Sequence, residues 1–333
     1  MTNHWLESIP EAQHDAARQA VTGAFGSAPI ASIDRIHGGA SGALAFRMGV
    51  SDRHYVLRLE TQRSPWRNPH QYACMRTAAE AQIAPPLRYA DDAAGVAILD
   101  FISQRPLTEF PGGPLALVKA LGLFAARLQA TEPFPALGNY RKFIEGMFAR
   151  MQTLFAPGLL APHAEAFERI QSAYPWEMAT HVSSHNDPNP RNLLFDGEQF
   201  WLVDWETAFR NDPLTDIAIL ADNNASNPEL QQALLRAWLG REPGRGDTAR
   251  LTLMKSITRL WYAGIVLTPP PHPDGKIADL SAPTVEEFRS SIATGKLHPV
   301  HIKATWGKMM LAGFLEDSRA ATFEVALKAA ADS

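Results

Sequence analysis

Cysteine is nearly absent from this 333-residue chain, since Cys74 is the only one. A single cysteine excludes a framework of internal disulfides and is typical of proteins in a reducing cytoplasm. Long hydrophobic runs are also missing, because none approaches the roughly 20 residues that a transmembrane helix needs. The first residues lack the basic and apolar regions of a signal peptide. We therefore expect a cytoplasmic protein without a membrane partner.

The chain also lacks a large excess of either charge sign. Its 31 Lys and Arg residues nearly balance its 35 Asp and Glu residues, for a net charge of -4. A nucleic-acid partner would receive no electrostatic support from this balance. The hydrophobic fraction of 46% is typical of a soluble globular protein, and the length suffices for two domains.

Two short apolar runs near the middle of the chain predict a β-hairpin. They cover residues 193–195 and 200–203, and Asp196-Gly197 between them is a common hairpin-turn dipeptide. The loop before the first run is too rich in Pro and Asn for a helix or a central strand. We therefore expect a loop followed by a hairpin.

Three polar side chains should converge at one end of this hairpin. Asp187 and Asn192 bracket the loop, and Asp204 follows the second run. Two oxygen ligands and one free carboxylate suit Mg²⁺ together with a general base. We assign Asn192 and Asp204 to the metal and Asp187 to the base.

Two other interpretations of the same residues stay open. The stretch could be a polar hairpin loop with acids at its ends and no chemistry. Alternatively, His181, His185 and Asp187 could bind a transition metal, although no further His or Cys cluster follows them.

The order His-x-Asp-x-x-x-x-Asn, followed by a strand that ends in Asp, is how kinases build a phosphoryl-transfer site. This stretch resembles the aminoglycoside phosphotransferase and choline/ethanolamine kinase family, and it is most similar to bacterial choline-kinase-like members. The resemblance is carried by His185-Asn186-Asp187, Val203-Asp204-Trp205-Glu206, Asn211-Asp212-Pro213 and Asp216. It implies ATP and Mg²⁺ as cofactors, with His185 bracing the catalytic loop. Asp216 would be a structural acid that hydrogen-bonds this loop, with substrate contact as the alternative.

The resemblance implies an α+β fold of the protein-kinase-like, two-lobe type. Residues 1–105 would form an N-terminal nucleotide-binding lobe, an antiparallel sheet with one helix. Residues 106–333 would form a larger, mostly helical catalytic and substrate-binding lobe. The Pro- and Gly-rich residues 106–114 mark the boundary, and apolar residues recur at helical spacing from Leu115 onward.

A Gly-rich segment at residues 38–42 lies between two strand-like segments. By pattern alone, a Gly-rich hairpin turn is the commoner explanation. The segment is not the Gly-x-Gly-x-x-Gly of protein kinases, but it is similar to the Gly-Gly-x-Ser loop of the family. That similarity implies phosphate binding by Gly38, Gly39, Ser41 and Gly42, where small residues let backbone N–H groups approach oxygens.

The strand expected at residues 53–60 carries Arg58 where kinases place a phosphate-binding Lys. Arg binds phosphate bidentately, so the role can be retained. Kinases orient this cation with an acid on the next helix, but the matching position here is Gln71. Either Gln71 hydrogen-bonds Arg58, or Glu60 or another acid pairs with it. An Arg58 that merely faces solvent beside Glu60 is the structural alternative.

The apolar segment 95–102 matches the hinge whose backbone binds adenine in the family, so Asp100 and Ile102 are further nucleotide-site candidates.

The phosphate acceptor is the least determined part of the prediction. Quaternary ammonium groups are held by aromatic faces and carboxylates, and the candidates here are Glu206, Trp261, Tyr262 and Trp306. The resemblance favours a small-molecule alcohol, choline, ethanolamine or another amino alcohol, as the acceptor. An aminoglycoside or a sugar remains an alternative acceptor. A catalytically silent kinase-like module that only binds nucleotide remains an alternative function.

A protein kinase is a further class to consider. The missing Gly-x-Gly-x-x-Gly, Asp-Phe-Gly and Ala-Pro-Glu motifs oppose it.

Overall fold

An antiparallel sheet forms the N-terminal part of the chain in the computed structural model, which describes residues 4–37, 43–61, 68–177, 180–267 and 275–331. The spatial order of its strands is β1-β2-β3-β5-β4, and every neighbouring pair is antiparallel. The strands are β1 (Ile30–Ile36), β2 (Ala43–Val50), β3 (Arg53–Glu60), β4 (Leu87–Asp91) and β5 (Val96–Asp100).

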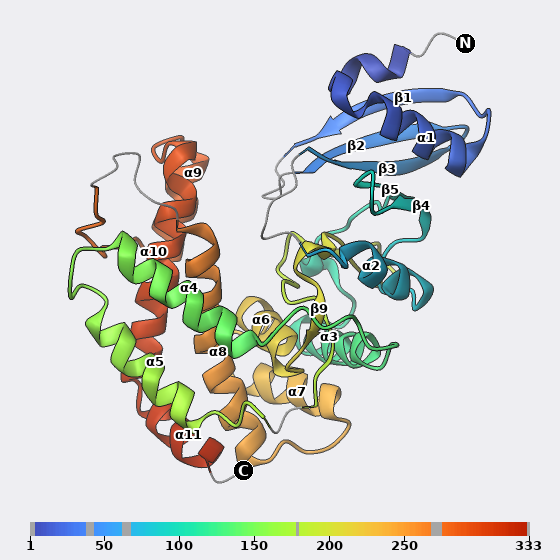
Figure 1. Cartoon of the computed structure of the whole chain (residues 1–333). Helices are drawn as coiled ribbons and strands as arrows, with labels where there is room; N and C mark the ends of the chain where they lie inside the picture. Colours follow the sequence, from blue (N-terminus) through green and yellow to red (C-terminus); the bar gives the residue numbers. More distant parts are fainter. Residues whose placement is uncertain (1–3, 38–42, 62–67, 178–179, 268–274, 332–333) are drawn as a thin grey trace. The chain divides into compact units, whose positions relative to one another are not determined.

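One face of this sheet carries a hydrophobic core because apolar residues alternate along its strands. Tyr55, Leu57 and Leu59 of β3 point into that core. Helix α1 (His14–Phe25) covers the same face with a stripe of small apolar residues (Figure 1). Arg58 and Glu60 alternate with the core residues and therefore lie on the opposite face of the sheet.

Chain contacts divide the protein into two units, Met1–Leu137 with Val182–Asn211, and Gly138–His181 with Asp212–Ser333. We call them the first and the second unit. Beyond the sheet and α1, the described residues of the first unit form two helices, two small β-ladders and four 3-10 helices. They are α2 (Gln71–Glu80), α3 (Gly113–Gln129), β6 (Val182–Ser184) paired with β9 (Phe209–Asn211), β7 (Leu193–Phe195) paired with β8 (Phe200–Leu202), η1 (His4–Ser8), η2 (Glu11–Gln13), η3 (Leu107–Glu109) and η4 (Trp205–Thr207).

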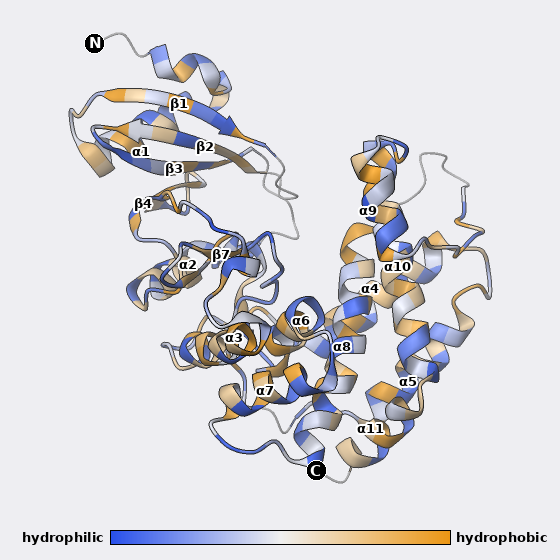
Figure 2. Ribbon diagram, turned by 180° about the vertical axis from the view of Figure 1, so that it is seen from behind, coloured by the Kyte–Doolittle hydropathy of each residue, from blue (hydrophilic) through white to orange (hydrophobic). Residues whose placement is uncertain are grey.

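The second unit is helical, and α8 (Arg245–Val266) is its central element because it contacts helices on several sides. Figure 2 shows hydrophobic and hydrophilic residues alternating along these helices, as expected for amphipathic helices around a shared core. The helices are α4 (Tyr140–Leu154), α5 (Ala161–Ala173), α6 (Leu214–Asn224), α7 (Pro228–Leu239), α8, α9 (Val285–Ala293), α10 (Pro299–Arg319) and α11 (Ala321–Ala331).

The α+β class and the kinase-like arrangement of a sheet lobe and a helical lobe are confirmed. The lobe boundary near residue 105 stays a prediction. Among the described residues, no helix combines the length and the apolar character that crossing a bilayer requires.

Candidate active site

The predicted hairpin forms in the first unit and carries two of the site residues at its open end. β7 and β8 pair antiparallel, with Leu193 opposite Leu202. The turn is closed by Asp196, whose carboxylate accepts hydrogen bonds from the backbone N–H groups of residues 198 and 199. Beyond the ladder, the Val203 N–H donates to the Asn192 carbonyl at 3.0 Å. Asn192 and the residue after Val203, Asp204, are thereby held at the same end.

The carboxylate of Asp187 is oriented by two neighbouring amides. The side-chain Nδ2 of Asn192 donates to Asp187 Oδ2 at 3.0 Å, and Nδ2 of Asn189 donates to Oδ1 at 2.7 Å. Asn192 uses its amide nitrogen in this contact, so its Oδ1 is the atom with acceptor capacity for a cation. Asp187 itself is half-buried. The role of Asn189 was missed, although an Asn-rich loop is a signal for such side-chain turns.

Buried residues support the loop from beneath. The His185 Nε2–H donates to the Val203 carbonyl at 3.0 Å, and the imidazole lies 4.6 Å, edge to face, from the Trp205 ring. Burial lowers the pKa of His185 to about 4, so the ring is neutral near pH 7. Asn186 has φ +62°, and its Nδ2 donates to the Thr207 carbonyl at 2.9 Å. These contacts tie the Asp187 loop to the segment after Asp204.

Asp204 lies in a left-handed conformation, with φ +66° and ψ +69°, at the start of η4. That conformation is uncommon for a residue with a side chain and is often found at functional sites. Its Oδ1 lies 3.1 Å from Arg58 Nη2, and Glu206 Oε2 lies 3.6 Å from the same nitrogen. The sheet and the hairpin loop therefore meet at the guanidinium of Arg58.

The other terminal nitrogen of Arg58 faces different partners. Nη1 donates to Gln71 Oε1 at 3.3 Å and lies 3.5 Å from Glu60 Oε1. Gln71 Nε2 and, at 2.9 Å, the Tyr72 hydroxyl both donate to that same Glu60 oxygen. Both contacts that the sequence offered as alternatives, Gln71 and Glu60, are therefore present together.

Among the described residues, the site holds more carboxylates than cations. Burial opposes the charge of Arg58, but nearby carboxylates, Asp204 foremost, outweigh it and the pKa is raised. Burial first, and then the charge of Asp204, raise the pKa of Glu206 to about 7, although Arg58 acts in the opposite direction. Asp187 adds to the same repulsion. An added cation would therefore be stabilised here.

The donor set fits a magnesium ion. Mg²⁺ is commonly bound by one or two carboxylates together with substrate phosphates, and the Asn192 amide oxygen and the Asp204 carboxylate supply such a partial set. No group of three or more His, Cys, Asp or Glu side chains arranged to hold a metal was found among the described residues. This leaves the alternative site of His181, His185 and Asp187 without support, because the imidazole of His185 is committed to the Val203 carbonyl.

The other predicted nucleotide-binding residues take no part in the contacts described above. Gly38, Gly39, Ser41 and Gly42 lie outside the described residues. Asp100 ends β5, and its carboxylate pairs bidentately with Arg88, with both N···O distances at 2.6 Å. Ile102 follows two residues later, and it is half-buried.

The acceptor candidates Trp261, Tyr262 and Trp306 belong to the second unit, as does Asp216, whereas Glu206 belongs to the first. Trp261 packs on Tyr140, with ring centroids 5.5 Å apart, and Tyr262 packs on Trp306 at 5.3 Å. The two candidates on adjacent positions of α8 thus belong to different aromatic pairs.

Tyr140 and Trp261 both bury a polar atom that lacks a hydrogen-bond partner among the described residues, the Tyr140 hydroxyl and the Trp261 Nε1. Burial, followed by the charges of Asp212 and Asp216, raises the pKa of Tyr140. Asp212 is buried and accepts a hydrogen bond from the Tyr174 hydroxyl at 2.7 Å. Aromatic rings and buried acids therefore meet within the second unit.

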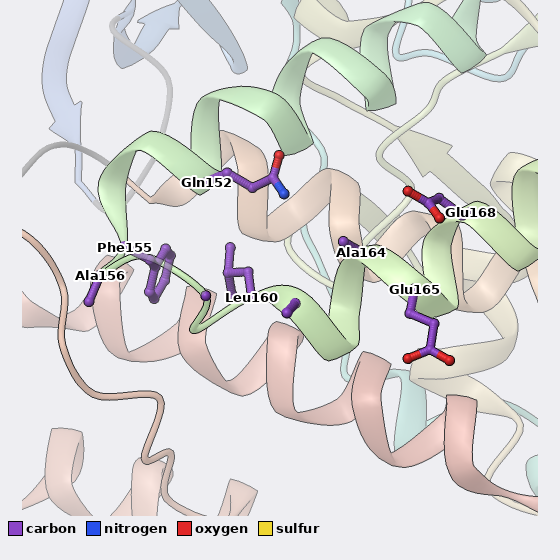
Figure 3. Close-up of a pocket in the computed structure, with 9 residues that line it drawn as sticks. Gln152, Phe155, Ala156, Leu160, Ala164, Glu165 and Glu168 are labelled. Carbon is purple, nitrogen blue, oxygen red and sulfur yellow. The ribbon is translucent and has the colours of Figure 1, made fainter.

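The second unit also has a cavity of about 370 Å³ where α4 ends and α5 begins (Figure 3). Its polar lining consists of an amide and two carboxylates, of Gln152, Glu165 and Glu168. It contains none of the predicted site residues.

Comparisons with known proteins identify a family and a fold. The family model described as "Phosphotransferase enzyme family" matches residues 32–251. Among solved structures, a choline/ethanolamine kinase family protein from Mesorhizobium loti superimposes with a TM-score of 0.72 and 20% identity, over 97% of this chain and 100% of that one. Choline kinase LicA from Streptococcus pneumoniae gives 0.59 and 11%, over 91% and 99%.

A more distant structure is the streptomycin–ATP–APH(2")-IIa ternary complex, with a TM-score of 0.56 and 15% identity over 76% of this chain and 91% of that one. At these identities the likeness shows the fold. A curated relative, an uncharacterized protein from Metamycoplasma hominis, is 28% identical over 74 residues, which are 21% of this chain and 15% of that relative.

Proposed function

The chain belongs to the phosphotransferase enzyme family, and we propose that it transfers the γ-phosphoryl group of Mg-ATP to the hydroxyl of a small alcohol. The observation that carries this proposal is the convergence of Asp187, Asn192 and Asp204 at the open end of the β7–β8 hairpin. Phosphoryl transfer relies on positioning and on charge stabilisation more than on covalent chemistry by the protein. A carboxylate held by two amides, beside an amide oxygen and a second carboxylate, supplies both.

Each residue has a distinct task in this proposal. Asp187 accepts the proton of the acceptor hydroxyl as its oxygen bonds to the γ-phosphorus and the bond to the leaving ADP oxygen breaks. Asn192 Oδ1 and Asp204 hold Mg²⁺, which neutralises charge on the phosphates when it is bound. Arg58 binds the α- and β-phosphates. His185 supports the loop, because its buried ring donates to the Val203 carbonyl and its lowered pKa opposes the uptake of a second proton near pH 7.

Choline, ethanolamine or another amino alcohol is the acceptor that we propose. In the first unit, the excess of carboxylates that the described residues place around the Arg58 guanidinium favours a cationic substrate. In the second unit, Tyr140 and Trp261 combine aromatic faces with nearby buried acids, which is the chemistry that binds ammonium groups. The solved structures described as choline or choline/ethanolamine kinases support the same class.

An aminoglycoside is the second candidate acceptor, because such a polycation would also be favoured by the acidic site and the fold is shared with a streptomycin complex. The experiment is ATP turnover measured against choline, ethanolamine, aminoglycosides and sugars, with Asp187→Asn as the inactive control. Turnover with one amino alcohol supports the proposal. Mg-ATP binding without transfer to any acceptor would contradict it and favour a catalytically silent nucleotide-binding module.

A further inference from the structure

Arg58 is held by its two terminal nitrogens in two different ways. Nη2 faces Asp204 and Glu206, the side where the proposed function places the metal and the phosphates. Nη1 faces Gln71 and Glu60, which belong to the sheet and to α2. One edge of the guanidinium is therefore anchored in the scaffold, and the other edge is directed to the reaction site.

We propose that Glu60 is the acid that orients Arg58 for nucleotide binding, acting through Gln71 and Tyr72. The position on α2 where kinases carry this acid is occupied by the neutral Gln71, and the negative charge lies on β3 instead. Gln71 connects the two groups, because its oxygen accepts from Arg58 and its nitrogen donates to Glu60. This inference rests on the proposed function, since it assigns a positioning residue to that same site.

The strand gives Glu60 a fixed place relative to Arg58. Residues two apart on a strand project from the same face, and β3 pairs with β2 on one side and β5 on the other. The Glu60 N–H also donates to the Gly95 carbonyl at 2.9 Å. Charge-assisted hydrogen bonds from Gln71 and Tyr72 then fix the carboxylate itself.

Helix α2 and Asn68, which precedes it, are in turn tied to the segment that follows Asp204. The Asn68 side-chain amide donates to the Ala208 carbonyl, and the Cys74 thiol contacts the same carbonyl at 3.4 Å. Burial raises the pKa of Cys74 to about 12, so the thiol keeps its proton and remains a donor. The relay from Glu60 to Arg58 thus shares one framework with Asp204.

The test compares wild type with Glu60→Gln, the double variant E60Q/Q71E and the control Glu80→Gln. Glu80 is an exposed acid at the end of α2. Its replacement by Gln removes the same charge at a position outside the group of Arg58, Glu60, Gln71 and Tyr72. The readouts are kcat and KM for ATP, ADP affinity by calorimetry, and the melting temperature. In Glu60→Gln the buried Arg58 guanidinium loses a charged neighbour. We therefore expect kcat/KM for ATP to fall by about ten- to hundred-fold.

The double variant returns the charge to the relay at residue 71, next to Nη1, so we expect it to regain ADP affinity to within about three-fold of wild type. Glu80→Gln should match wild type. Unchanged ADP affinity and ATP KM in a folded Glu60→Gln, or no recovery in the folded double variant, would overturn the inference.

A second variant keeps the test decisive if Glu60→Gln does not fold. Tyr72→Phe removes one donor to Glu60 and leaves its charge, so we expect a smaller loss of ADP affinity, about three- to ten-fold, at nearly constant melting temperature. An ADP affinity equal to wild type would count against the relay. Calorimetry measures ADP binding without an acceptor, so it tests the role of Glu60 even if no alcohol is phosphorylated. A failure to phosphorylate any alcohol would contradict the proposed function and not this inference.

Discussion

Asn192 donates its side-chain nitrogen to the Asp187 carboxylate at 3.0 Å, and this contact joins the proposed base to a proposed metal ligand. The amide has two ends with separate uses, since its nitrogen orients the base and its oxygen is available to a cation. Asn189 orients the same carboxylate from the other side, at 2.7 Å, but is not proposed as a metal ligand.

This difference makes a matched pair of variants informative. Asn189→Ala should lower kcat by about ten-fold, because one charge-assisted hydrogen bond to the base is lost, and it should leave the Mg²⁺ dependence unchanged. Asn192→Ala should lower kcat further and also raise the Mg²⁺ concentration needed for half-maximal rate. Rate measurements over a Mg²⁺ titration check this. Identical Mg²⁺ dependence in the two variants would contradict the assignment of Asn192.

Replacing Arg58 by Lys tests whether the site needs a cation with two separate terminal nitrogens. Lys keeps the charge but has a single ammonium, so it cannot contact Gln71 and Asp204 through separate nitrogens as Arg58 does. We expect KM for ATP to rise by about ten-fold, with a loss of roughly 1–3 kcal/mol in the free energy of unfolding. Steady-state kinetics and urea denaturation provide the two values. Wild-type values for both would show that the guanidinium geometry is unimportant.

Sequence reasoning predicted the β7–β8 hairpin because its determinants are local. Asp196-Gly197 fixes the turn, and the lengths of the two apolar runs fix where Asn192 and Asp204 emerge. Short strands such as β6 and β9 were not predicted, because three-residue ladders leave no periodicity to detect.

The environment of Arg58 could be predicted only in part. Sequence spacing placed Arg58 and Glu60 on one face of a strand, but it left Gln71 and Glu60 as alternatives. Whether a neutral side chain bridges two charged ones depends on the distance between β3 and α2, which is set by tertiary packing. The contact of Asn189 with Asp187 depends on tertiary packing that local patterns do not encode. The same holds for the buried polar atoms of Tyr140 and Trp261, which have no hydrogen-bond partner in the part of the chain that the structure describes.

The lowered pKa of the buried His185 should make the stability of the protein depend on pH. Its folded pKa of about 4 is below the ordinary value of 6.5, so the unfolded chain binds a proton that the folded chain does not between these values. Stability therefore falls as pH decreases from about 7 to 4, by roughly 3 kcal/mol from this group.

The matched variant is His185→Gln, which retains a donor for the Val203 carbonyl and cannot titrate. It should be less stable than wild type near pH 7.5, where the imidazole packing is lost, and the difference should shrink toward pH 5. Urea midpoints at pH 7.5, 6 and 5 check this. A difference that stays constant across that range would mean that His185 titrates normally.

Tyr140→Phe separates substrate binding from folding. Removing a buried hydroxyl without a partner among the described residues should leave the melting temperature unchanged or slightly raised. If that hydroxyl contacts the acceptor, KM for the acceptor should rise by about ten-fold while KM for ATP stays the same. Kinetics with each substrate varied in turn distinguish the two. An unchanged acceptor KM would remove Tyr140 from the proposed acceptor site.

The most direct measurement is ³¹P NMR of Mg-ATP with choline or ethanolamine, comparing wild type with Asp187→Asn. The account predicts that wild type converts the γ-phosphate signal into a phosphomonoester and ADP. Asp187→Asn should fold equally well and lose at least about a hundred-fold in rate, because its amide cannot accept the hydroxyl proton. A folded Asp187→Asn protein that forms the phosphomonoester at the wild-type rate would contradict it.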